Sequence, residues 1–78
     1  MPTVLRRGPY RVFFFSHEPD EPPHVQVDAG GATAKFWIAG VTLARNGGFA
    51  PHEVRRIRRM LLEHEARLLE AWNAYFEA

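Results

Sequence analysis

The spacing of hydrophobic residues changes at about residue 49, and this change divides the chain into two parts. Before it, apolar residues alternate with polar ones or form short runs broken by glycine and proline, which is typical of β-strands. After it, apolar residues recur every three or four positions, as on an amphipathic helix. The pattern predicts one domain over residues 1–78, with a sheet over 1–49 and a helix over 50–77.

Short hydrophobic segments in the first part predict up to five strands. They are Pro2–Arg6, Tyr10–Phe15, His24–Asp28, Ala32–Ile38 and Val41–Arg45. The first four form two pairs, and each pair is joined by a glycine-containing junction short enough for a hairpin. The pattern is weakest in the last strand, so we expect a four- to five-stranded antiparallel meander sheet.

The second part predicts one long helix over Pro51–Phe76, because this stretch contains no glycine and no further proline. Pro51 suits the first helical position, and the carboxylate of Glu53 can reach back to a free backbone amide. Ala50, at the cap position, has no side-chain acceptor, which weakens this end by about 1 kcal/mol relative to serine. The expected fold class is α+β, with the helix packed on one face of the sheet.

The predicted helix is longer than the sheet it covers. Its 26 residues extend about 39 Å, whereas strands of five to seven residues extend about 17–23 Å. A second apolar row widens the buried arc in the C-terminal half, and so broad an arc is normally covered on more than one side. We therefore predict a homodimer contact or partner groove at Leu62, Leu69, Trp72 and Phe76. The alternative is that the helix bends and wraps its own sheet.

Strand alternation also predicts two faces for the sheet. The residues expected to face the helix are Val12, Phe14, Val25, Val27, Ala34, Phe36 and Ile38. The residues expected on an open, opposite face are Arg11, Phe13, Phe15, His24, Gln26, Lys35 and Trp37. Such a mixture of aromatic and cationic side chains suits a protein interface or the stacking of RNA bases. We favour protein, because a net charge of +1 is low for binding many phosphates.

Nine of the ten cationic residues are arginines, and four of them lie close together in the first half of the predicted helix. These four are Arg55, Arg56, Arg58 and Arg59. Cations at this end oppose the helix macrodipole, so helix stability does not explain them. They form either a solubilising face or a contact for an anion, namely a phosphate backbone or an acidic partner.

Histidines and acidic residues offer a further possible site. His17 and His24 flank a loop with three carboxylates, where a divalent metal or an acid/base group could be assembled. Their spacing matches no known ligand pattern, and a solvated acidic loop is the simpler explanation. We expect no metal and no cofactor, and we single out His24 as the candidate catalytic residue.

Size and composition limit the remaining possibilities. A domain of 78 residues is marginally stable alone, and without cysteines it has no disulfides to stabilise it, so a partner chain is expected. The longest apolar run is too short to span a membrane, and the first residues do not resemble a signal peptide. We therefore expect a cytoplasmic protein without a membrane partner.

Several segments together resemble a known family of small bacterial proteins, domain of unknown function 4160. The segments are MPTVLR (1–6), PYRVFFFS (9–16), EPPHVQV (21–27), AKFWI (34–38), LARNGGF (43–49) and LEAWNAYF (69–76). The resemblance implies a partner from a second short family, domain of unknown function 2442, in a two-gene toxin–antitoxin-like module. Relatives commonly carry His-x-His at the third strand, whereas this chain has Gln26 at the second position. A metal site or a catalytic pair at that strand would therefore lack one of its two histidines.

We expect a protein-binding domain that is one component of such a module. The first alternative is an RNA-binding or RNA-cleaving toxin that uses His24 with Arg11 or Lys35. The second is a divalent-metal-binding domain with ligands at His17 and His24. No complete catalytic motif is present, so binding is favoured over catalysis.

Overall fold

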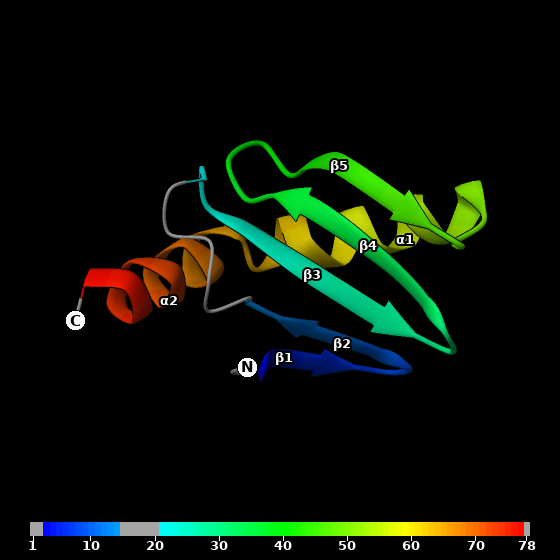
Figure 1. The fold of residues 1–78 in the computed structure, drawn as a ribbon, viewed down its shortest axis with the longest axis horizontal. Coiled ribbons are helices and arrows are strands. Elements are labelled where there is room, and N and C mark those ends of the chain that lie inside the picture. Colours follow the sequence, from blue (N-terminus) through cyan, green and yellow to red (C-terminus); the bar gives the residue numbers. More distant parts are fainter. Residues whose placement is uncertain (1–2, 15–20, 78) are drawn as a thin grey trace.

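The computed structural model describes residues 3–14 and 21–77, which form a five-stranded sheet followed by two helices (Figure 1). The strands are β1 (Thr3–Arg7), β2 (Tyr10–Phe13), β3 (His24–Ala29), β4 (Ala32–Trp37) and β5 (Thr42–Gly47). The helices are α1 (Pro51–Glu63) and α2 (Glu65–Glu77). The predicted α+β class is therefore confirmed, and so is the fifth strand.

The sheet is an antiparallel meander in which each strand pairs with the next along the chain. The predicted topology is confirmed, and strand ends differ by one or two residues. β2 ends at Phe13, and Phe15, the predicted last residue of this strand, lies outside the described residues. An irregularity between Lys35 and Phe36 shifts the register with β5, which runs two residues further than predicted.

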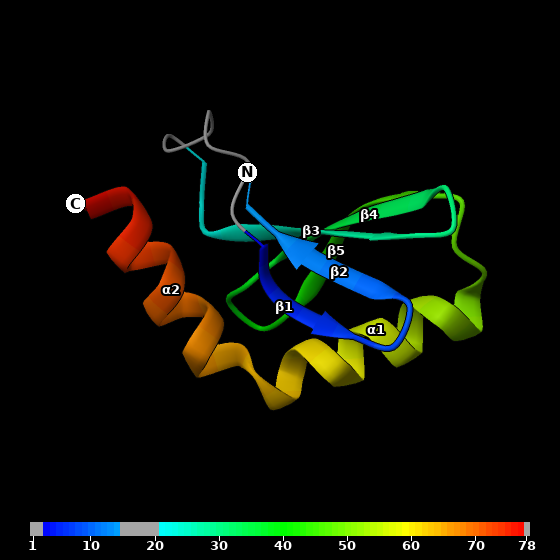
Figure 2. The ribbon, with the colours of Figure 1, turned by 90° about the horizontal axis from the view of Figure 1, so that it is seen from below.

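The prediction of one long helix is wrong, because the helix breaks at His64. The backbone of His64 has φ −121° and ψ 15°, and its N–H donates to the carbonyl of Leu61 at 3.0 Å. No glycine or proline marks this position in the sequence. α1 lies under the sheet, whereas α2 turns up past the end of the sheet (Figure 2). A straight helix would have run beyond the short strands, and the turn instead buries Leu68 and Trp72.

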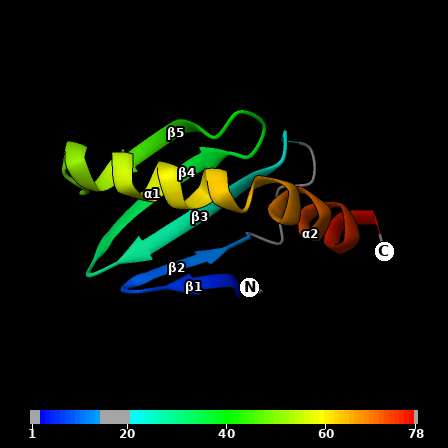
Figure 3. The same ribbon diagram turned by 180° about the vertical axis from the view of Figure 1, so that it is seen from behind.

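The core lies between the sheet and the helices, with α1 crossing one face of the strands (Figure 3). All seven residues predicted to face the helix belong to this core, so that prediction is confirmed. The helices contribute Ile57, Met60, Leu61, Leu68 and Trp72. Neither described helix is both long and apolar enough to cross a membrane.

The turn between β4 and β5 joins the sheet to both helices. Gly40 N–H donates to the carboxylate of Glu65 at the start of α2, at 3.0 Å. Arg58 on α1 donates from Nε to the carbonyl of Val41 at 2.9 Å. Val41 is buried at a φ of 47°, which is unfavourable for a β-branched side chain. These two hydrogen bonds attach the turn to α1 before the helix break and to α2 after it.

The start of α1 has the predicted cap. Ala50 is the N-cap and offers no side-chain acceptor, while Glu53 Oε1 accepts a hydrogen bond from the Ala50 N–H at 3.2 Å. Just upstream, the side chain of Asn46 makes two hydrogen bonds with the backbone of Phe49, at 2.9 and 3.0 Å. These bonds hold the short connection from β5 into the helix.

Candidate functional site

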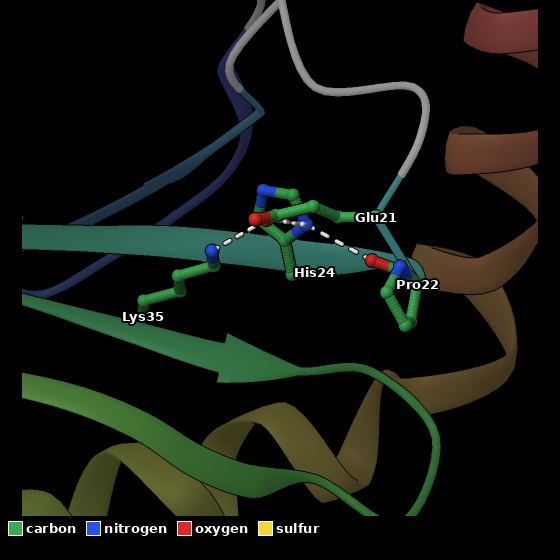
Figure 4. Close-up of polar contacts among 4 residues, drawn as sticks. All are labelled: Glu21, Pro22, His24 and Lys35. Atoms are coloured by element: carbon green, nitrogen blue, oxygen red, sulfur yellow. Dashed lines mark hydrogen bonds and ion pairs between the residues drawn. The ribbon is translucent and has the colours of Figure 1, made fainter.

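The doubled proline before β3 places His24 at the end of the sheet nearest α2. Pro23 continues the pairing with β4, because its carbonyl accepts a hydrogen bond from Ile38 N–H at 2.9 Å. Prolines cannot donate to a strand ladder, so they suit this position just before the strand. His24 is the first residue of β3, and its side chain lies on the sheet face opposite α1 (Figure 4).

His24 is completely buried, with an exposed fraction of 0%. Its Nδ1 lies 3.0 Å from the carbonyl oxygen of Pro22, and because a carbonyl can only accept, Nδ1 carries the proton. The imidazole packs against Trp37 of β4 at 5.8 Å and against Trp72 of α2 at 5.0 Å between ring centroids. In this conformation His24 connects the sheet to α2 and does not face solvent.

Beside His24, Lys35 forms a short ion pair with Glu21. Lys35 Nζ lies 2.6 Å from Glu21 Oε1, which also lies 3.7 Å from His24 Nδ1 (Figure 4). The ammonium is 4.8 Å from the centre of the Trp37 ring, where the negative face of the indole attracts it. The Lys35 hydrogen bond lowers the pKa of Glu21 below its ordinary value. The pair offsets the cost of burying a cation, and it engages Lys35 within the fold.

The predicted outer face, meaning the sheet face opposite α1, is only partly open. Arg11, Gln26 and Trp37 are half-buried. His24 and Lys35 are buried, and so is Phe13, with the Arg11 guanidinium 4.6 Å above its ring. The expectation of a fully open face is therefore wrong for His24, Lys35 and Phe13. Trp72 of α2 packs against His24, Glu21 pairs with Lys35, and the Arg11 guanidinium lies over the ring of Phe13. Phe15 lies outside the described residues.

Two exposed arginines that the sequence did not assign to the outer face also belong to it, as the strand pairing shows. Arg6 of β1 lies directly opposite Arg11, and Arg45 of β5 lies directly opposite Lys35. Paired residues in an antiparallel sheet share a face, so both arginines belong to it. Alternation in the first strand could have indicated Arg6. Alternation could not indicate the face of Arg45, because the irregularity between Lys35 and Phe36 shifts the pairing of β4 with β5.

The four predicted anion-contact arginines are all exposed, but their surroundings differ. Arg58 is used within the fold, where it donates to the Val41 carbonyl. Arg55 is exposed and does not line the cavity described next. Arg56 and Arg59 line a cavity of about 330 Å³ together with Arg7 from the end of β1. Sequence spacing could not indicate Arg7, because its proximity to α1 depends on how the sheet and helix pack.

The predicted partner contact on the helix is also divided. Leu62 and Leu69 are exposed at 42% and 38%. Trp72 is buried, and its ring lies 5.4 Å from Phe14 and 4.1 Å from Phe76. Trp72 and Phe76 thus pack on the protein's own core, as the bent-helix alternative predicts, and only the two leucines remain as a solvent-facing row.

The predicted metal site falls partly outside the described residues, because His17 lies there. Among residues 3–14 and 21–77, no group of three or more His, Cys, Asp or Glu side chains could hold a metal ion. Gln26 points to the same outer face as Lys35, its partner across the sheet, and contributes an amide in place of a second histidine.

The comparison with known protein families agrees with the strand and helix motifs described above. A family described as Domain of unknown function (DUF4160) matches residues 10–73, from the start of β2 to the last turns of α2. The chain belongs to this family. The matched region contains β3 with its proline entry, the outer-face residues of β2 to β5 and the arginines of α1. Neither the curated proteins nor the solved structures include a match.

Proposed function

We propose that this protein is a binding domain that takes a protein partner on its outer face, as one component of a two-gene bacterial module. The observation that supports this most is the distribution of side chains on that face. Arg6 and Arg45 are exposed and Arg11 is half-buried, while two rings of this face, Phe13 and His24, are buried. Arginine with partly exposed tryptophan is typical of the residues that dominate protein interfaces.

The same distribution favours protein over RNA. Stacking of RNA bases needs accessible ring faces, and Trp37 is the one outer-face ring of the described residues that is not buried. Carboxylates also lie among the cations, since Asp28 pairs across the sheet with Arg11 and Glu21 binds Lys35. Such a mixed surface repels a phosphate backbone locally, whereas a protein partner can match both signs of charge.

An RNA-cleaving function receives less support from the geometry. Its predicted residues are His24 with Arg11 or Lys35. His24 has no solvent-exposed surface, and Lys35 is held by Glu21 at 2.6 Å. General acid/base catalysis requires a side chain within hydrogen-bond reach of the substrate. These side chains would have to leave their present contacts before they could act.

The partner expected from the family resemblance is a short protein of the domain of unknown function 2442 family. Cations exceed carboxylates on the outer face, so we propose that the partner presents an acidic surface. Electrostatic complementarity of this kind accelerates association and rejects partners of the wrong charge.

The test is to co-express the protein with the product of the neighbouring gene and to measure their affinity by isothermal titration calorimetry. In the double variant Arg6→Glu/Arg45→Glu, we expect affinity to fall by about tenfold or more, which corresponds to about 1.4 kcal/mol. Both side chains are exposed, so the fold should be retained. Arg67→Glu makes the same type of charge change at an exposed position of α2 and should bind like wild type.

Two results would overturn the proposal. One is the absence of any complex with the wild-type protein at micromolar concentration. The other is an equal loss of affinity in the outer-face variant and the Arg67→Glu control, which would indicate a general charge effect. Growth arrest that depends on His24 without loss of folding would instead favour the toxin alternative.

A further inference from the structure

The cavity beside α1 combines three arginines from segments far apart in the sequence. It has a volume of about 330 Å³ and lies between the end of the β1–β2 hairpin and α1. Arg7 approaches from the hairpin, and Arg56, Arg59 and Glu63 approach from α1. Tyr10 and Met60, both largely buried, supply apolar lining. We call this site the arginine cavity.

Two of these arginines have no partner within the described chain. Arg7 Nη1 lies 3.3 Å from Glu63 Oε2 and 3.3 Å from His64 Nε2, so Arg7 is anchored to the end of α1. Arg56 and Arg59 make no hydrogen bond or ion pair with any residue of the described segments. They are three residues apart on one helix, where like charges repel by a few tenths of a kcal/mol. Glu63, four residues after Arg59, offsets part of that cost, and a bound anion would offset the rest.

We propose that the arginine cavity binds a phosphate monoester. Its lining carries three guanidinium groups and one carboxylate, so it has an excess of two positive charges. A phosphate monoester carries about −1.5 to −2 charges at neutral pH and offers three strong acceptor oxygens. Three guanidinium groups from different positions can therefore each engage one oxygen. A carboxylate has one charge and two oxygens, which one arginine satisfies in a bidentate pair.

The dimensions of the cavity limit the rest of the ligand. Pockets that hold small molecules have volumes of about 300–1,000 Å³, and this cavity is at the lower end of that range. It suits a phosphate with a small apolar or sugar-sized body resting on Tyr10 and Met60. The phosphate can belong to a free small molecule or to the 5′ end of an RNA. The cavity lies on the α1 side of the sheet, so this proposal is independent of a partner on the outer face.

The test measures binding of 5′-AMP, adenosine and inorganic phosphate by calorimetry at low and moderate salt. We expect 5′-AMP and phosphate to bind, adenosine to fail, and the affinity of 5′-AMP to decrease with salt. In Arg56→Gln/Arg59→Gln, affinity should fall by about tenfold or more. The control Arg55→Gln/Arg67→Gln removes the same charge from exposed helix positions outside the cavity and should lower the affinity much less. Thermal unfolding should show that both double variants are folded.

Two further measurements identify the source of the phosphate and challenge the choice of anion. If a short RNA with a 5′-phosphate binds more tightly than 5′-AMP, the cavity is a phosphate site for RNA ends. If the two bind with equal affinity, the cavity is a phosphate site for small molecules. The proposal is overturned if neither phosphate nor 5′-AMP binds, or if the control loses as much affinity as the cavity variant. It is also overturned if an acidic peptide binds more tightly than 5′-AMP.

Discussion

Truncation of Trp72 should be much more harmful than truncation of Leu69, although the two residues lie three positions apart on α2. Trp72 is 5% exposed and contacts Phe14, His24 and Phe76, whereas Leu69 is 38% exposed. The periodicity of the sequence places both in one predicted partner contact. The structure separates them, because α2 packs Trp72 against the core and leaves Leu69 on its exposed side.

The expected magnitude follows from the buried area. An aromatic side chain buries about 150–250 Å², and at about 25 cal/mol per Å² its loss removes about 4–6 kcal/mol. Large-to-small substitutions of buried aromatic residues typically cost about 3–5 kcal/mol. We therefore expect Trp72→Ala to lower the free energy of unfolding by about 4 kcal/mol. A domain of 78 residues has only about 4–12 kcal/mol in total.

The measurement is urea denaturation followed by far-ultraviolet circular dichroism, with hydrogen exchange on the backbone amides of α2. Trp72→Ala should either unfold the domain or release α2 from the sheet, so that its amides exchange faster while the sheet stays protected. The matched control, Leu69→Ala, should cost less than about 1 kcal/mol, because an exposed leucine loses little buried area.

Equal destabilisation by the two substitutions would refute this reasoning. It would mean that Leu69 is buried as deeply as Trp72 in solution, for example by a second copy of the chain. Concentration dependence of the unfolding midpoint would then identify a dimer. A negligible effect of Trp72→Ala would show that α2 does not depend on this contact.

Two further substitutions test the ends of the fold. Ala50→Ser should raise the free energy of unfolding by about 1 kcal/mol in urea denaturation, because the serine hydroxyl can accept a hydrogen bond from a first-turn N–H group. The control Ala66→Ser in α2 should not stabilise the fold, and equal effects of the two substitutions would contradict the cap assignment. Glu21→Gln should reduce stability at neutral pH. Because the folded pKa of Glu21 lies below its ordinary value of 4.5, the stability that the Lys35 pair contributes is present above pH 4.5 and is lost below it. Unfolding free energies measured from pH 7 to pH 3 should therefore converge for wild type and Glu21→Gln, and a constant difference would contradict the role of this pair.

Much of the fold could be predicted from the sequence, because it depends on local patterns. Alternation predicts the strands, and all seven residues that it assigns to the helix-facing side belong to the core, since side chains in a strand point to opposite faces in turn. Pro51 and Glu53 identified the start of α1. The helix break could not be predicted, because His64 and its neighbours contain no glycine or proline and the break depends on packing against the sheet end.

The candidate sites were predicted less completely. The outer face was assigned to the correct side of the sheet, but the burial of His24 and Lys35 depends on Trp72 and Glu21, which are distant in the sequence. The sequence groups the four arginines of α1 into one cluster. Only the packing of the hairpin against α1 shows that Arg56 and Arg59 face Arg7 across a cavity.

The order of the strands and the helical region, the two faces of the sheet and the family of the chain can all be read from its residues. The strands, the helical region and the two faces follow from the period of hydrophobic residues and from turn residues, which act over a few positions, and the family follows from the motifs of residues 10–73. Which side chains stay accessible depends on how the helices pack against the sheet. A helix longer than its sheet must turn to bury its last apolar residues, and that turn brings Trp72 against His24 while Leu62 and Leu69 stay in solvent. The bond of Arg58 to Val41 and the cavity lined by Arg56 and Arg59 depend in the same way on how α1 packs against the sheet.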